Sequence, residues 1–221
     1  MDPASLPPAV LECLDAVSRL EREEPPASRA ALAARLGLDD AAAGERLGQL
    51  ETLGLLRAER GGRLRLTAAA RPIALRLVRR HRLLERFLTD QLRLPWERVH
   101  EEASRLTPVL ADDVAEALAT LLGDPATCPH GNPIPAPDGT LRPEHATSLD
   151  RLKAGQAAII LRIEREERGL LRDLAALGLL PQTKVEVDEV APFGGPLLVR
   201  VGSARYALGR EVAARILVRK A

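Results

Sequence analysis

The sequence is poor in cysteine, in aromatic residues and in long apolar runs, and the first and last of these scarcities each exclude a class of protein. Two cysteines, Cys13 and Cys128, are too few for a disulfide framework, so we expect a protein of the reducing cytoplasm. No apolar run reaches the ~18 residues that a transmembrane helix needs. No charged segment followed by an apolar one opens the chain as a secretory signal would. We therefore expect neither secretion nor a membrane partner.

An excess of charge of one sign is also lacking, since 32 Lys and Arg stand against 31 Asp and Glu. Net charge alone therefore does not indicate a nucleic-acid partner. The 221 residues, 46% of them hydrophobic, are enough for two or three small globular domains.

Three short helices and a hairpin are predicted within residues 1–71. Apolar residues recur at helical spacing over 7–24, 28–37 and 39–54. Two alternating runs then flank the glycine pair at 61–62, which is a hairpin signal. This order predicts a winged helix-turn-helix that binds DNA.

A helical domain is expected over residues 72–145. Helical patterns cover 72–92, 95–106 and 108–122, and the composition of 136–150 is typical of a linker. The apolar face of these helices suits a dimer interface, although internal packing alone would give the same pattern.

Residues 146–221 change character, because short strand patterns separated by Gly and Pro surround one amphipathic helix. This arrangement predicts a small SH3-like β-barrel. The expected fold class is α+β, with an N-terminal winged helix-turn-helix, a helical dimerisation domain and the C-terminal barrel.

Potential metal ligands gather in the middle of the chain. His81 and Glu85 are four residues apart and share one helix face, His100 opens the next helix, and Cys128 and His130 lie in a loop. Imidazole, thiol and carboxylate together suit a borderline transition metal. An ordinary helix-surface pair at 81 and 85, and a packing role for the loop, would give the same pattern.

Three motifs together resemble one family. RRHRLLERFL at 79–88, VHEEA at 99–103 and CPHGNPIP at 128–135 are similar to segments of the diphtheria toxin repressor family of metal-dependent transcriptional regulators. The last 70 residues also resemble the SH3-like ferrous-transport accessory domain. The resemblance covers almost the whole chain. It implies a cytoplasmic homodimer, not an enzyme, that binds Fe(II) or Mn(II), with Zn(II) as a further option, and then double-stranded operator DNA.

The resemblance implies an ancillary metal site that joins the helices to the barrel. Its expected ligands are His81, Glu85, His100, Glu164 and Glu167. Another branch of the family recruits the residues that correspond to Cys128 and His130.

The family's primary metal site is altered in this chain. Three of its usual ligand positions hold Ser104, Thr107 and Pro108, and its N-terminal ligand aligns with Glu12. Hydroxyls are poor ligands for Mn(II) or Fe(II) and Pro has no donor side chain, so we expect this site to be lost or rebuilt.

The expected DNA-reading helix, at about 40–52, is small and acidic. Residues 39–53 carry four acidic side chains and one Arg, so the helix gains little from phosphate, while the arginines of the hairpin compensate in part. The candidate DNA contacts are Arg29, Ala41, Ala42, Glu45, Arg46, Gln49, Arg60 and Arg63.

Two functions from different classes therefore stand beside each other. The leading one is a metal-responsive regulator, expected to be a repressor, of Mn and Fe homeostasis genes. The alternative is a degenerate member of the family that binds metal or protein partners without a specific operator. Metal-dependent hydrolysis would need an open coordination position and a base, and no motif here asks for it.

Overall fold

The structure is a computed structural model that describes residues 6–21, 26–141 and 145–220. Residues of the chain cluster into two compact units. The first comprises residues 1–84, 103–124 and 135–141, and the second comprises 85–102, 125–134 and 142–221. Helices and an antiparallel sheet are both present, so the predicted α+β class is confirmed. The predicted boundaries of three domains stay a prediction, and residues 142–144 of the expected linker lie outside the described residues.

The first unit contains the predicted winged helix-turn-helix. Its elements are α1 (Pro8–Leu20), α2 (Arg29–Leu36), α3 (Asp40–Thr52), β1 (Leu56–Ala58) and β2 (Leu64–Leu66). The side chains of Ser28 and Asp39 cap α2 and α3 by accepting hydrogen bonds from backbone N–H groups in their first turns. Gly37 ends α2 in the left-handed conformation that favours glycine. Leucines of all three helices and of both strands form one core.

A long helix continues from the wing. It is α4 (Ala70–Asp90), and it is followed by α5 (Val99–Leu106), the 3-10 turn η2 (Thr107–Val109) and α6 (Asp112–Leu121). In the first unit, Arg79 of α4 makes a bidentate ion pair with Glu116 of α6 at 2.7 Å. Arg80, which is 3% exposed, pairs with Asp112 at 2.8 Å. Two arginine–carboxylate pairs therefore hold α6 against α4.

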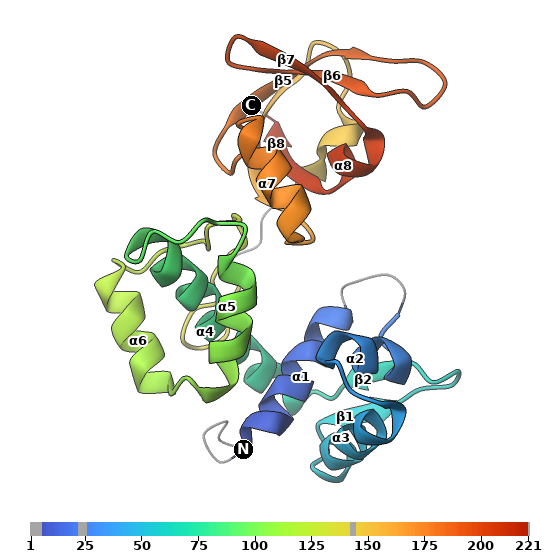
Figure 1. The fold of residues 1–221 in the computed structure, drawn as a ribbon, viewed down its shortest axis with the longest axis vertical. Helices are drawn as coiled ribbons and strands as arrows, with labels where there is room; N and C mark the ends of the chain where they lie inside the picture. Colours follow the sequence, from blue (N-terminus) through green and yellow to red (C-terminus); the bar gives the residue numbers. More distant parts are fainter. Residues whose placement is uncertain (1–5, 22–25, 142–144, 221) are drawn as a thin grey trace. The chain divides into compact units, whose positions relative to one another are not determined.

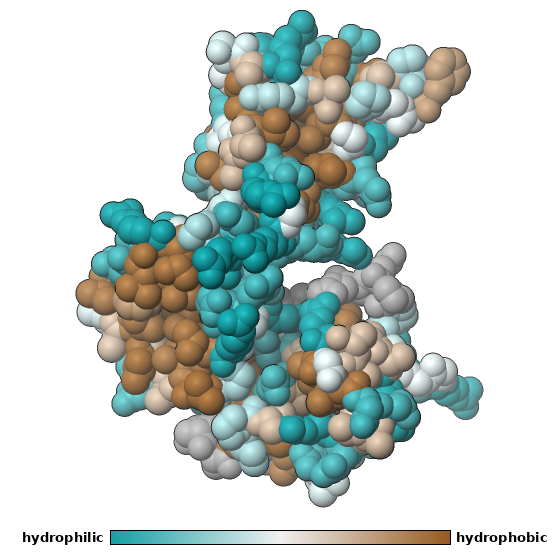
Figure 2. Space-filling view, viewed as in Figure 1, coloured by the Kyte–Doolittle hydropathy of each residue, from teal (hydrophilic) through white to brown (hydrophobic). Residues whose placement is uncertain are grey.

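One face of α6 is apolar and exposed. Val114 and Leu121 are two turns apart on the helix and are 46% and 62% exposed. Val109 of η2 is 65% exposed. Figure 2 shows a continuous hydrophobic area over α6. An exposed apolar area of this kind indicates an interaction surface.

The second unit is built around a six-stranded antiparallel sheet with the order β3-β8-β4-β5-β6-β7. The elements are β3 (Thr147–Ser148), η3 (Leu149–Arg151), β4 (Ala157–Ile163), α7 (Arg168–Ala176), β5 (Lys184–Val190), β6 (Leu197–Val201), β7 (Ala204–Leu208), α8 (Arg210–Ala214) and β8 (Ile216–Lys220). The curled sheet and α7 are orange and red in Figure 1. Aliphatic side chains from β4, β5, β6, β8 and α7 form its core. A bulge between Ile160 and Arg162 shifts the register of β4 against β8.

The CPHGN turn, residues 128–132, packs directly on β4 within the second unit. The N–H of Ile163 donates to the carbonyl of His130 at 3.0 Å. Gly131 has a φ of +86°, and a Cβ at this position would come within 1.9 Å of the Leu161 carbonyl oxygen. Only glycine allows this approach, so the turn is fixed to the strand.

Replacement of Gly131 by Ala should therefore destabilise the protein more than the same change at Gly155. Gly155 has a similar φ of +79° but open space around its Cβ position. The backbone strain alone should cost about 1–2 kcal/mol in Gly155→Ala, and the collision should add about 2 kcal/mol in Gly131→Ala. Chemical unfolding followed by the fluorescence of Trp96, the single tryptophan, measures both. Equal losses would contradict the tight contact with β4.

Candidate metal centre

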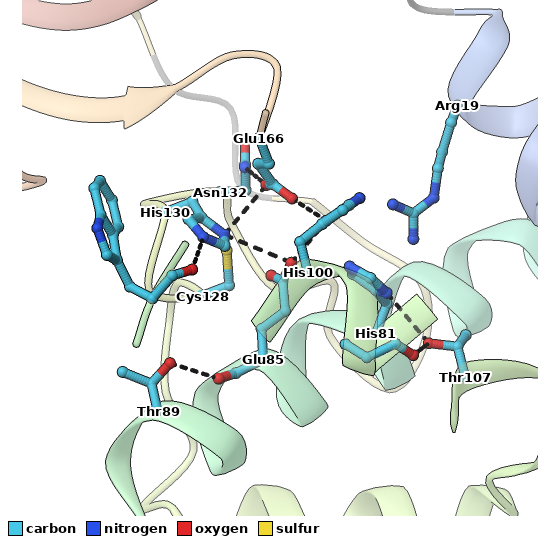
Figure 3. A network of polar contacts seen from close by, with 12 residues as sticks. Arg19, His81, Glu85, Thr89, His100, Thr107, Cys128, His130, Asn132 and Glu166 are labelled. Carbon is cyan, nitrogen blue, oxygen red and sulfur yellow. Dashed lines mark hydrogen bonds and ion pairs between the residues drawn. The ribbon is translucent and has the colours of Figure 1, made fainter. Parts of the chain in front are cut away.

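Five potential metal ligands converge within the second unit (Figure 3). Glu85 comes from the last part of α4, His100 from α5, and Glu166 from the segment between β4 and α7. Cys128 and His130 come from the CPHGN turn. One donor atom from each of Glu85, Cys128, His130 and Glu166 lies within 4.8 Å of the others. Segments far apart in the sequence thus bring carboxylate, thiol and imidazole together.

Both imidazoles face both carboxylates. His100 Nδ1 lies 3.1 Å from Glu85 Oε1 and also contacts Glu166 Oε2. His130 Nδ1 lies 3.5 Å from Glu85 Oε1 and 3.5 Å from Glu166 Oε1. Glu85 and His130 are fully buried, and Glu166 is 14% exposed. Positive charge must therefore accompany these carboxylates, because isolated charges are costly in such an environment.

The backbone of Trp96 sets the orientation of the His130 ring. His130 Nε2 lies 2.8 Å from the Trp96 carbonyl oxygen, which only accepts, so Nε2 carries the hydrogen and donates it. The Trp96 ring also lies against the imidazole, with centroids 5.4 Å apart. Nδ1 is consequently the nitrogen that faces Cys128 and the carboxylates, and it is the one available to an ion.

Burial and charge shift the pKa values of this cluster. Burial, with the nearby Glu85 carboxylate, raises the pKa of the Cys128 thiol to about 12. Burial opposes charging of His130, but the carboxylates of Glu166 and Glu85 outweigh it and raise its pKa well above the ordinary value. The pKa of Glu166 is lowered: burial and Glu85 act to raise it, whereas His130 and His100 prevail. Without an ion, these shifts favour a protonated His130 beside the carboxylates and a Cys128 that remains a thiol.

The barrel contributes a different carboxylate from the two expected. Glu164 is exposed, and Glu167 is exposed and pairs with Arg215 at 3.3 Å. The structure brings Glu166 into the cluster instead. Arg165 adopts a φ of +57°, so the chain turns sharply between the strand and the helix. Neither strand alternation nor helical spacing reveals which of the three neighbouring carboxylates faces inward.

His81 is one helical turn before Glu85 on the continuous helix α4. Within the first unit its Nδ1 lies 3.2 Å from the hydroxyl of buried Thr107. That hydroxyl donates to the Ala103 carbonyl at 2.7 Å, so it accepts from His81. A neutral His81 ring therefore carries its lone pair on Nε2.

The other positions of the expected primary site provide little. Glu12 is exposed on α1, Ser104 and Pro108 are half-buried, and Thr107 is engaged with His81. In the described residues, Glu12 belongs to none of the groups of donors that lie close enough to share an ion. The expectation that this site is lost or rebuilt remains a prediction.

The donor set of the second unit fits a divalent ion. The imidazole of His130, the carboxylates of Glu85 and Glu166 and the thiolate of Cys128 suit Mn(II), Fe(II) or Zn(II), with the thiolate favouring the softer ions. His100 lies beside the same two carboxylates and adds a second imidazole. The outer contacts of a metal site are also present, since His130 donates to a carbonyl and Glu166 accepts a hydrogen bond from Asn132. Sequence reasoning missed Glu166, Asn132 and the Trp96 carbonyl.

The predicted DNA-reading residues occupy one side of the winged helix. Ala41, Glu45 and Gln49 are exposed at successive turns of α3, and Ala42 and Arg46 are half-buried beside them. Of these side chains, Glu45 is acidic, Arg46 is basic and the others are uncharged.

Arg29 is already engaged at the first turn of α3. Its guanidinium pairs with the Asp40 carboxylate at 2.6 Å and lies where a Cβ on Gly44 would stand. It would have to exchange this partner for a phosphate. Arg60 and Arg63 are exposed on either side of Gly61 and Gly62 at the tip of the wing. The exposed basic charge of the winged helix-turn-helix therefore includes the arginines at the tip of its wing.

Comparisons with known proteins agree with this architecture. Residues 67–136 match the family model of the iron dependent repressor, metal binding and dimerisation domain, and residues 147–220 match the FeoA domain. The iron-dependent repressor IdeR of Mycobacterium tuberculosis is 34% identical over 213 residues, which are 91% of this chain and 92% of that protein. The chain belongs to the iron-dependent repressor family. The family resemblance drawn from the three motifs is thereby confirmed.

Two solved structures share the fold. A manganese-dependent transcriptional repressor in complex with manganese is similar with a TM-score of 0.85 and 30% identity, over 96% of this chain and all of that one. ScaR with bound Cd²⁺ is similar with a TM-score of 0.79 and 26% identity, over 96% and 99%. The predicted fold, a winged helix followed by a helical block and an SH3-like domain, is confirmed. Among the described residues, no helix has both the length and the apolarity to cross a membrane.

Metal binding at this cluster should displace a proton from Cys128 and another from His130, since burial favours the Cys128 thiol and the carboxylates of Glu166 and Glu85 favour a protonated His130. The apparent affinity for Zn(II) should therefore rise with pH between about 6 and 8. In Cys128→Ser the number of displaced protons should fall by about one, because a serine hydroxyl keeps its proton. Calorimetry in two buffers of different ionisation enthalpy counts the protons. An unchanged count would exclude Cys128 as a ligand.

Proposed function

We propose that this protein is a cytoplasmic, dimeric transcriptional repressor whose binding to operator DNA depends on Mn(II) or Fe(II), and that it controls genes of metal homeostasis. Regulation rather than catalysis is its role. The observation that carries the proposal is the convergence of Glu85, His100, Cys128, His130 and Glu166 in a chain of this family. His81, one turn from Glu85, is proposed as a further ligand through Nε2.

The proposed site joins segments that are independent in sequence. A divalent ion carries two positive charges and would lie beside two carboxylates. It would therefore replace the protonated imidazole of His130 as their counter-charge. Glu85 lies on α4, the helix that continues from the wing, and Glu166 follows the barrel strand β4. Fixing these side chains together restrains helix α4. The winged helices can adopt an arrangement that binds DNA and one that does not. Metal stabilises the DNA-binding arrangement only to the extent that this arrangement binds the metal more tightly than the other does.

Metal should strengthen specific DNA binding by about tenfold or more, within the usual range of coupling between sites. Operator duplexes are first selected from random sequences in Mn(II), and fluorescence anisotropy at fixed salt then measures binding with and without Mn(II), Fe(II) or Zn(II). Glu166→Gln should remove most of the response, because it removes a charged ligand. Glu164→Gln, an exposed neighbour, is the matched control and should respond as the parent does. Loss of the response in both variants, or in neither, would contradict the proposed ligand set.

A second candidate is the degenerate family member that binds metal without a specific operator. The acidic side chains of α3 and the Arg29–Asp40 pair favour it. It predicts that the selection enriches no sequence, while Mn(II) still binds at the cluster. Weak binding that disappears steeply with salt would also support this candidate.

The exposed apolar face of α6 is proposed to form the dimer. Leu121→Glu should shift the equilibrium from dimer to monomer, because a charge would have to be buried in the interface. Phe193→Glu is the control, since Phe193 is fully exposed in the second unit. Sedimentation at micromolar concentration measures both variants. A Leu121→Glu protein that remains as dimeric as the parent would place the interface elsewhere.

A further inference from the structure

Glu166 reaches the metal cluster from a segment without regular structure. It lies between the end of β4 and the start of α7, next to Arg165 in the left-handed conformation. The other ligand carboxylate, Glu85, is on a helix. A ligand carried by a loop needs a separate contact that fixes its orientation, because small displacements weaken a metal site strongly.

Asn132 provides such a contact. Its side-chain N–H donates to Glu166 Oε1 at 2.6 Å (Figure 3). The same oxygen lies 3.5 Å from His130 Nδ1, whereas Oε2 contacts His100 Nδ1. The hydrogen bond therefore distinguishes the two oxygens, since one is held by the amide and the other is directed at the imidazole of α5.

Asn132 is itself firmly placed. Its backbone carbonyl accepts a hydrogen bond from the backbone N–H of Cys128 at 2.9 Å, which closes the turn. The neighbouring Gly131 fits against Leu161 so closely that no side chain would be accommodated. The backbone carbonyl of His130 accepts a hydrogen bond from the N–H of Ile163 in β4. The backbone that carries the Asn132 amide is therefore fixed against the barrel. If the Glu166 side chain turned outward, the amide could not move with it and the hydrogen bond would break.

We infer that Asn132 is a positioning residue of the metal centre, which holds Oε1 of Glu166 so that Oε2 faces the ion. This inference rests on the proposed function. Asn132 touches no ion in this arrangement and acts through Glu166 alone. Outer contacts of this kind typically change metal affinity by about 10–100-fold when they are removed.

Titration with Mn(II), followed by the electron paramagnetic resonance of the free ion, tests the inference in the full-length protein. Asn132→Ala should weaken Mn(II) binding about tenfold. Asn132→Asp, of nearly the same size, should also weaken it, because a carboxylate cannot donate the hydrogen bond that holds Glu166 Oε1. Gln156→Ala removes an amide that caps a turn elsewhere in the second unit and should bind as the parent does.

A double-mutant cycle separates positioning from general support. In a Glu166→Ala background, Asn132→Ala should change the affinity less than about twofold, because its route to the ion is gone. The visible spectrum of bound Co(II) should also change in Asn132→Ala, since the coordination by Glu166 changes, while a role in folding alone would leave it unaltered. Thermal unfolding without metal verifies that the Asn132→Ala protein is folded.

Two outcomes overturn the inference. One is an Asn132→Ala protein with the affinity and Co(II) spectrum of the parent. The other is a loss that persists undiminished in the Glu166→Ala background. Failure of the parent protein to bind Mn(II) or Zn(II) is a separate result, which would overturn the proposed function together with this inference.

Discussion

Two carboxylates that face each other inside the protein impose the central constraint on this structure. Glu85 is fully buried and Glu166 nearly so, and each lies beside both His100 and His130. Like charges in such surroundings repel strongly unless a cation stands between them. A proton on His130 meets this need in part, as its raised pKa indicates. A divalent ion would meet it more fully and would also recruit the Cys128 thiolate.

The remainder of the second unit makes this arrangement possible. Gly131 lets the CPHGN turn lie against β4, the Trp96 carbonyl directs the His130 ring, and Asn132 holds Glu166. Each contact joins segments that the sequence separates by about thirty residues or more. The cluster is therefore a product of the packed barrel and turn together, whereas α4 alone would supply only the pair His81 and Glu85.

Regular elements could be predicted from the sequence because their signals are local. Apolar spacing located the helices, Ser28 and Asp39 marked helix starts, and the pair Gly61-Gly62 marked the wing. Cys128 and His130 were recognised by residue type and motif, and the structure places them beside Glu85. Glu166 could not be distinguished from Glu164 and Glu167, because a β-bulge and the left-handed Arg165 set which carboxylate turns inward. A role for Asn132 could not be predicted for a related reason, since this role depends on its contact with Glu166, which is distant in the sequence.

The most direct measurement of the account is the position of the ion in crystals grown with Mn(II). Anomalous scattering at the manganese edge should give a peak bounded by Glu85, His100, Cys128, His130 and Glu166, with Glu164 and Glu167 outside its coordination sphere. The account would be contradicted if crystals grown in saturating Mn(II) held the ion only at other positions. It would also be contradicted if His100 and His130 were turned away from an empty cluster.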